Sequence, residues 1–139
     1  QYIPGFIINR LQGALATEVY RLLENGCCTA EDLDLAVKTS LMPRGLLLGL
    51  VQRMDFTGLD MMVNGLTNKS YQPAPDPGEP KMFFDAVARG DLGAKTGKGL
   101  YDYSHLSYEE LLQQRDRMLM QSVALAKAFI EHPLHKKED

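Results

Sequence analysis

Cysteine is scarce in this sequence. The 139 residues include only two, Cys27 and Cys28, which are adjacent. Neighbouring cysteines do not supply the spaced pairs of a disulfide framework or a zinc site. We therefore expect both thiols to remain reduced, as in the cytoplasm.

Long apolar runs and basic clusters are also lacking. The longest apolar stretch, Leu46 to Val51, is far shorter than the ~20 residues of a membrane-spanning helix. The formal net charge is -3, and no run of Lys and Arg alternates with aromatic residues. We expect a soluble protein that binds neither membranes nor nucleic acid.

The size and start of the sequence suggest one domain of a larger protein. At 139 residues and 45% hydrophobic composition, a single globular domain spanning 1–139 is expected. The chain starts at Gln1, with no Met and no secretion signal, so we expect that an upstream segment has been removed.

Apolar residues recur at helical spacing, and no stretch alternates as a half-buried strand does, so an all-α fold is predicted. The first helix should start near Pro4 and carry its apolar stripe from Ile8 to Leu22. Asn25-Gly26 should end it. Further helices are predicted over about Ala30 to Thr39, Gly45 to Met54, Thr57 to Leu66, a short segment stopped at Gly90, and about Ser107 to Pro133.

Local signals place the helix boundaries. Capping boxes are predicted at 29–32, 57–60 and 107–110, each with a hydroxyl residue three positions before an acidic one. Pro43 is expected to break the chain between the second and third helices. The third helix is so apolar that burial is expected on most sides, in its own core or against a partner chain.

Two segments, one rich in proline and one rich in glycine, are predicted to connect helices. Four prolines between Lys69 and Pro80 predict an extended loop, and four glycines within 90–99 predict a tight turn. The turn is not a P-loop, because no glycine precedes Gly97-Lys98 at the required spacing. It also lacks the third glycine and the flanking elements of a dinucleotide fingerprint.

The three histidines offer no catalytic or metal site. His105, His132 and His135 all lie late in the chain, and none has a carboxylate at a spacing that would fix its tautomer. We predict that no metal is bound.

Asn9 is the strongest candidate for chemistry. It lies early in an apolar helix, with Gly13 and Ala16 on the same face, so a ligand can approach the helix there. A carboxamide both donates and accepts hydrogen bonds. The alternative is that Asn9 bonds a neighbouring loop in the core, and the pattern alone favours that structural role.

Four motifs in register point to a family. Residues 4–11 (PGFIINRL), 29–36 (TAEDLDLA), 55–60 (DFTGLD) and 92–103 (LGAKTGKGLYDY) together resemble the C-terminal domain of 3-hydroxyacyl-CoA dehydrogenases. That domain shares its helical architecture with 6-phosphogluconate dehydrogenase-like enzymes. The resemblance covers about 1–103 and leaves 104–139 as an additional helix and tail.

The resemblance implies a role in the NAD-dependent oxidation of 3-hydroxyacyl-CoA to 3-oxoacyl-CoA, as in fatty-acid β-oxidation. In the family, a His-Glu pair in an upstream Rossmann domain, absent from this chain, removes the hydroxyl proton, and that domain binds most of the NAD. Asn9 matches the motif asparagine that reaches the reacting end of the substrate, so the resemblance makes it a catalytic residue. A homodimer is also implied, while the chain alone should be inactive and bind no cofactor.

Two alternatives remain. The family commonly has a Pro-x-Gly-Pro stretch about eight residues before the aspartate matching Asp55, whereas Pro43-Arg-Gly45 lies further upstream here. This difference leaves room for a related dehydrogenase of free hydroxy acids, such as a gulonate-type enzyme. A non-catalytic helical association module would also suit the apolar third helix and the long terminal helix.

Overall fold

The computed structural model describes residues 7–70, 72–132 and 134. Its α-helices, in chain order, are α1 (Ile7–Glu24), α2 (Ala30–Ala36), α3 (Met42–Thr57), α4 (Leu59–Thr67), α5 (Lys81–Arg89) and α6 (Tyr108–Glu131). A π-helical turn, η1 (Val37–Leu41), joins α2 to α3, and a 3-10 turn, η2 (Ala94–Thr96), follows α5. The described residues contain isolated β-bridges only, so the all-α prediction is confirmed.

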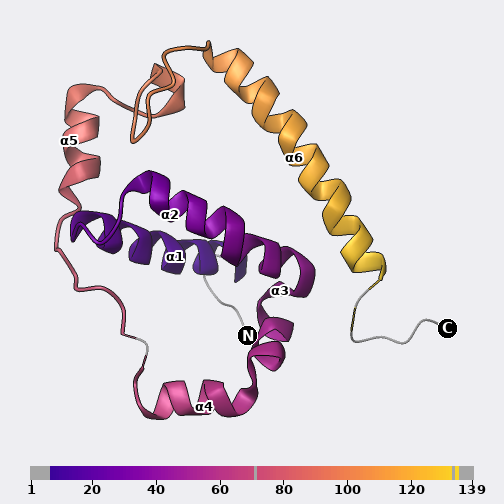
Figure 1. Cartoon of the computed structure of the whole chain (residues 1–139). Coiled ribbons are helices and arrows are strands. Elements are labelled where there is room, and N and C mark those ends of the chain that lie inside the picture. The colour runs from indigo at the N-terminus through magenta and orange to yellow at the C-terminus, as the bar shows by residue number, and fades with distance from the viewer. Residues whose placement is uncertain (1–6, 71, 133, 135–139) are drawn as a thin grey trace.

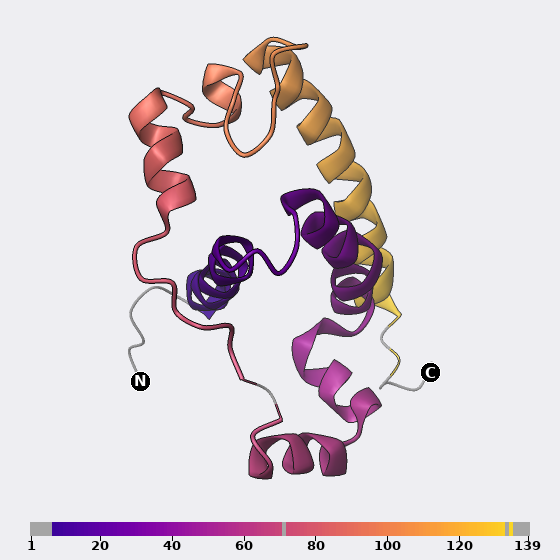
Figure 2. The ribbon, with the colours of Figure 1, turned by 60° about the vertical axis from the view of Figure 1, so that its left-hand side comes forward.

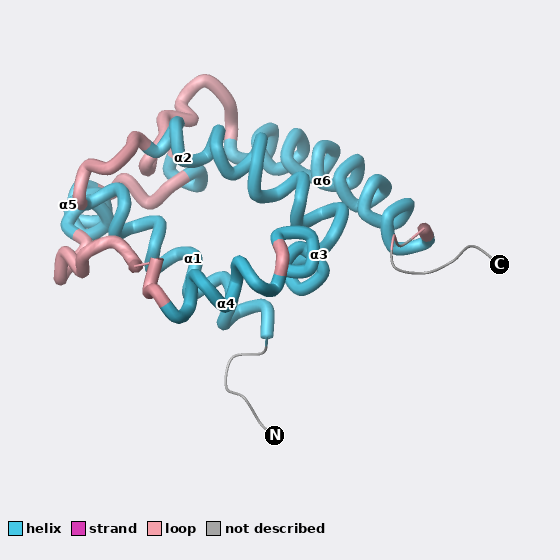
Figure 3. The backbone as a smooth tube through the Cα atoms, turned by 60° about the horizontal axis from the view of Figure 1, so that its bottom comes forward, coloured by secondary structure: helices cyan, strands magenta, loops and turns pink. Residues whose placement is uncertain are grey.

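The helices surround α1 rather than packing into a dense bundle. In Figure 1, α4 lies at the bottom of the molecule and the segment that precedes α6 lies at the top, with α1 and α2 between them. Figure 3 shows the loops concentrated around α5 and the start of α6. Within the described residues, no helix combines the length and apolar character that crossing a membrane requires.

The end of α1 follows the predicted signal. Gly26 has φ +65°, and its N–H donates to the carbonyl of Leu23 at 3.0 Å. The Cys27 N–H reaches back to the Leu22 carbonyl at 2.9 Å. These two bonds form a Schellman motif, which satisfies the last carbonyls of the helix.

Side chains of α1 hold the proline-rich segment in place. The Ala74 N–H donates to Glu18 Oε1 at 2.9 Å, and the Met82 N–H donates to Glu24 Oε1 at 2.6 Å. Between these two bonds, Arg21 Nη2 forms an ion pair with Asp76 Oδ2 at 3.1 Å. Because proline removes backbone donors, this extended segment depends on such outside partners. They also fix where α5 starts.

The predicted break at Pro43 is wrong. The chain continues as helix from α2 through η1 into α3, and Pro43 lies in the first turn of α3. In η1 the Met42 N–H reaches the carbonyl of Val37, five residues back. The π turn resets the hydrogen-bond register, so Pro43 falls where a missing N–H costs little.

The break instead falls within α3, at Gly49. Its φ of +69° and ψ of -173° are non-helical and divide α3 into two parts. Non-glycine residues essentially never occupy this region of backbone space. The predicted helix Gly45 to Met54 therefore contains the real interruption.

Of the three predicted capping boxes, the one at 107–110 is complete, the one at 29–32 forms only its N-cap bond, and the one at 57–60 is wrong. The Asp32 N–H donates to Thr29 Oγ1 at 3.1 Å, and Ser107 and Glu110 form both bonds of their box. In the third, Thr57 is still in α3 and its hydroxyl donates to the Arg53 carbonyl, while Gly58 caps α4 without a side chain. Thr57 therefore cannot cap α4.

Ser107→Ala is expected to lower the free energy of unfolding by about 1 kcal/mol, because an N-cap hydroxyl and its partner amide are lost. Chemical denaturation monitored by circular dichroism measures this change. Ser70→Ala is the control, since Ser70 is exposed and its backbone N–H donates to the Gly65 carbonyl, a bond that survives the substitution. Equal midpoints for both variants would show that the box contributes nothing.

Very little of the chain is buried. Among the described residues only Ala86 is buried, with 6% of its surface exposed, and the predicted stripe residues Ile8, Leu11 and Leu15 are exposed. The expected burial of Leu46 to Val51 is likewise absent from the single chain, where Val51 is 77% exposed. The chain exposes 11342 Å², against about 7,200 Å² for a folded monomer of its mass. The single chain therefore exposes roughly 4,100 Å² more surface than a compact folded monomer of its mass.

Candidate functional site

Asn9 lies in the first turn of α1 and is exposed. Its carboxamide forms no hydrogen bond to another described residue. Gly13 and Ala16, on the same face, are also exposed, and a Cβ added to Gly13 would meet nothing within 4 Å. The amide therefore projects from an open face that a ligand can approach.

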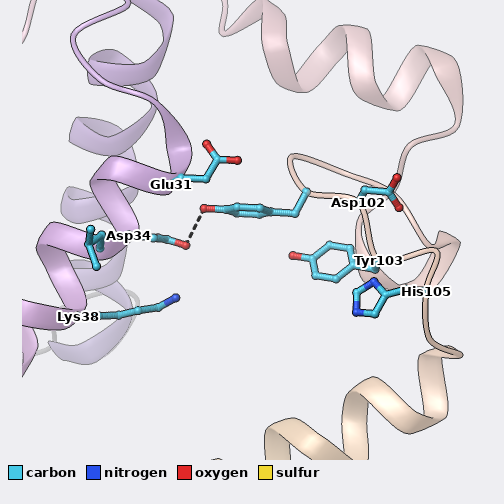
Figure 4. A pocket seen from close by; sticks show the side chains of 8 residues that line it. Glu31, Asp34, Lys38, Asp102, Tyr103 and His105 are labelled. Carbon is cyan, nitrogen blue, oxygen red and sulfur yellow. Dashed lines mark hydrogen bonds between the residues drawn. The ribbon is translucent and has the colours of Figure 1, made fainter.

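Two of the four motifs meet in space. The Tyr101 hydroxyl, from the segment after the glycine-rich turn, donates to Asp34 Oδ2 of α2 at 3.0 Å (Figure 4). The ring of Tyr103 lies edge-on to that of Tyr101, with centroids 6.3 Å apart. Sequence analysis missed this contact, although both partners lie within the quoted motifs.

A depression of about 590 Å³ opens beside this contact. Figure 4 shows Lys38, Tyr103 and His105 at its edge. Carboxylates outnumber cationic groups among its lining residues, which are Glu31, Asp34, Leu35, Lys38, Tyr101, Asp102, Tyr103 and His105.

The surroundings of Tyr101 favour the protonated form of its hydroxyl, which is therefore a hydrogen-bond donor. Loss of solvent contact, followed by the hydrogen bond to Asp34 and the nearby charges of Asp34 and Glu31, raises the pKa of Tyr101 to about 12. The hydroxyl thus keeps its proton at neutral pH and cannot act as a base. Asp102 is different, because hydrogen bonds from Ser104 lower the pKa of its carboxyl group.

Tyr101→Phe should remove a pH-dependent part of the stability. Because folding raises the Tyr101 pKa, the stabilisation is complete below pH 10 and is lost as the pH rises from about 10 to 12. Urea midpoints measured across this range should fall more steeply for the wild type than for Tyr101→Phe. Tyr103→Phe, which removes the neighbouring hydroxyl, should keep the wild-type slope. If all three proteins follow one slope, the hydrogen bond to Asp34 has no stabilising role.

The glycine-rich turn is closed on itself. The Gly93 N–H donates to the Lys98 carbonyl at 2.8 Å, and the Leu92 N–H donates to Thr96 Oγ1 at 2.9 Å. A Cβ at Gly99 would lie 2.7 Å from the Gly93 Cα, so glycine is required for the close approach. The prediction of a structural turn is confirmed. These two amides are therefore already satisfied within the turn.

Two of the three histidines lie in the part of the chain that the structure describes. His105 lines the depression, His132 caps the end of α6, and His135 lies outside the described residues. In the part of the chain that the structure describes, no group of three or more His, Cys, Asp or Glu side chains is arranged to hold a metal ion.

Most of the chain matches a known protein family. Residues 5–103 match the family model described as 3-hydroxyacyl-CoA dehydrogenase, C-terminal domain. The chain is 35% identical over 108 residues to the mitochondrial hydroxyacyl-coenzyme A dehydrogenase of Homo sapiens, a match covering 72% of this chain and 32% of that protein.

A second relative has a different substrate in its name. The chain is 28% identical over 120 residues to the 5-formyl-3-hydroxy-2-methylpyridine 4-carboxylate 5-dehydrogenase of Mesorhizobium japonicum, covering 85% of this chain and 38% of that protein. A crystal structure of a dehydrogenase of this name, described as an NAD+ dependent dismutase, matches with a TM-score of 0.72 and 27% identity. That match covers 91% of this chain and 40% of the solved one. The chain thus spans about a third of the length of the curated relatives cited here.

Proposed function

Because this chain belongs to the family of 3-hydroxyacyl-CoA dehydrogenase C-terminal domains, we propose that it is the substrate-side domain of an oxidoreductase that interconverts 3-hydroxyacyl-CoA and 3-oxoacyl-CoA. Asn9 carries the proposal: it lies within the matched residues, and its amide is exposed on a face of small residues. NAD is assigned to a separate dinucleotide-binding half, because the glycine-rich turn of this chain is closed on itself.

The proposed role of Asn9 is electrostatic. An amide donor directed at the substrate oxygen, or at the catalytic base of the other half, stabilises charge that develops during the reaction. Such a donor acts best in a site from which water is excluded, and Asn9 is open to solvent in the single chain. The site is therefore completed when the dinucleotide-binding half covers this face of α1.

The excess surface supports two partners. The exposed surface of the chain exceeds that of a compact folded monomer by about 4,100 Å². This excess is larger than the area that one partner buries in a standard protein interface. We assign this surface to the dinucleotide-binding half, which has to face Asn9, and to a second copy of the chain in a homodimer. The exposed apolar residues of α1 and α3 would be covered in that assembly.

A second candidate substrate class is a free acid without coenzyme A. The matches to the pyridine carboxylate dehydrogenases cover 85% and 91% of this chain, shares that residues 1–103 alone cannot supply. These matches therefore extend toward α6. The match to the human acyl-CoA enzyme covers 72% of this chain, a share that residues 1–103 can supply without α6. This difference favours a free hydroxy or aromatic acid as the alternative.

Substrate assays on the protein with its dinucleotide-binding half decide between the two classes. The proposal expects NADH oxidation with acetoacetyl-CoA and at least a 100-fold lower kcat/KM for acids lacking coenzyme A. Turnover of pyridine carboxylates or sugar acids, with none of acetoacetyl-CoA, would establish the alternative. Absence of turnover with both classes would reject the enzymatic proposal.

A further inference from the structure

The two cysteines lie outside the site described above. Cys27 and Cys28 belong to the turn between α1 and α2, which Figure 2 shows as a thin connection between the two helices. Both are free thiols, and Cys27 is exposed while Cys28 is half-buried. The proposed function uses neither sulfur, so the pair is available for chemistry of its own.

Hydrogen bonds on both sides hold this turn in place. The Cys27 N–H donates to the Leu22 carbonyl at the end of α1, and Thr29 accepts from the Asp32 N–H at the start of α2. The chain bends at both cysteines instead of running extended. Successive side chains point to opposite faces in an extended strand. The bend removes that restriction and lets both sulfurs reach the same ligand atom.

A disulfide between the two cysteines is disfavoured by the backbone. Consecutive Cα atoms are about 3.8 Å apart across a trans peptide, whereas disulfides usually join Cα atoms about 4.4–6.8 Å apart. A bond between neighbours is therefore strained and easily reduced. The pair keeps two thiols, in agreement with their free state in the structure.

A metal ion is also a poor match for the pair. Tetrahedral metal sites take three or four ligands from the protein. Throughout the described ranges, no three His, Cys, Asp or Glu side chains are grouped to hold a metal ion. Two sulfurs without a third ligand suit a thiophilic centre with two exchangeable positions. A trivalent arsenic atom that carries one organic group is such a centre.

We propose that Cys27 and Cys28 together bind one trivalent organoarsenical. With phenylarsine oxide, two As–S bonds form, the As=O bond and two S–H bonds break, and the oxygen leaves as water with both thiol protons. Arsenic stays trivalent, so the reaction needs no oxidant or reductant. The second As–S bond closes within one molecule, which favours it over attachment to two separate thiols. This site is independent of the proposed enzymatic function.

Binding of phenylarsine oxide to the full protein in excess 2-mercaptoethanol tests the site. The monothiol competes with attachment through a single sulfur, and native mass spectrometry gives the Kd. Cys28→Ser leaves one thiol in the turn and should raise the Kd by about 100-fold or more, because the chelate is lost. A wild-type Kd for this variant would overturn the inference.

The matched control is the double variant Cys28→Ser, Ser70→Cys. Ser70 is exposed, so this variant again has two thiols in the chain, but they are no longer adjacent. Its Kd should stay as high as that of Cys28→Ser. Recovery of the wild-type Kd would show that adjacency is not required and would also overturn the inference.

Peptide mapping of the unmodified protein provides a test that does not depend on the variants folding. After reaction with one equivalent of phenylarsine oxide, arsenic should be found on the peptide that contains both Cys27 and Cys28. The dithiol 2,3-dimercaptopropanol should release it, because that reagent supplies two sulfurs of its own. Arsenic located on any other peptide would place the binding site elsewhere and refute the assignment.

Discussion

Replacing Asn9 by alanine is expected to lower kcat of the dehydrogenase by about 10²- to 10³-fold, the usual cost of removing one donor to a developing oxyanion. The fold should be unaffected, because Asn9 is exposed and forms no hydrogen bond to another described residue. Steady-state kinetics with acetoacetyl-CoA and NADH measure the rate, and circular dichroism checks the fold. A loss in kcat rather than a rise in KM identifies an interaction made mainly in the transition state.

Asn64→Ala is the matched control for Asn9. Asn64 is also an exposed asparagine on a helix, and its backbone carbonyl accepts from the Asn68 N–H, a bond that alanine retains. Its kcat should stay within twofold of wild type. An Asn9→Ala enzyme with an unchanged rate would return Asn9 to a structural role.

Gly49→Ala should cause the largest loss of stability among single changes in α3. A Cβ is strained at φ +69° and ψ -173° even though no atom lies within 4 Å of it. We expect the free energy of unfolding to fall by about 1–3 kcal/mol, as measured by urea denaturation at fixed protein concentration. The strain should also pull the two parts of α3 toward one continuous helix.

Gly45→Ala separates strain from helix propensity. Gly45 belongs to the same helix, has no positive φ, and also has open space around its added Cβ. This substitution should be neutral or stabilise by about 0.5–1 kcal/mol, as alanine generally does within a helix. If both variants shift the midpoint equally and in the same direction, the interruption at Gly49 does not exist in solution.

Local sequence signals predicted local structure well. The stop at Gly26, the N-cap bond at Thr29 and the complete box at 107–110 were predicted correctly because each involves residues no more than a few positions apart. The box at 57–60 fails because the Thr57 hydroxyl has a competing acceptor in α3, the Arg53 carbonyl. Pro43 misleads because a π turn changes the register before it.

Long-range contacts had no such local signal. Nothing in the spacing of Glu18 indicates that its carboxylate accepts from the N–H of Ala74, or that Tyr101 reaches Asp34. Periodicity identified which faces are apolar, but it cannot name what covers them. Residues such as Leu15 and Leu119 therefore appear as core positions in the sequence and as exposed positions in the single chain.

We propose that this chain supplies one wall of the substrate site and an amide donor, while hydride and proton transfer belong to another half of the enzyme. NADH-dependent reduction of acetoacetyl-CoA, followed by absorbance at 340 nm, tests it directly on residues 1–139 alone and on the protein joined to its dinucleotide-binding half. We expect no turnover by the isolated chain and clear turnover by the joined protein. Measurable, NADH-dependent turnover by residues 1–139 alone would contradict it.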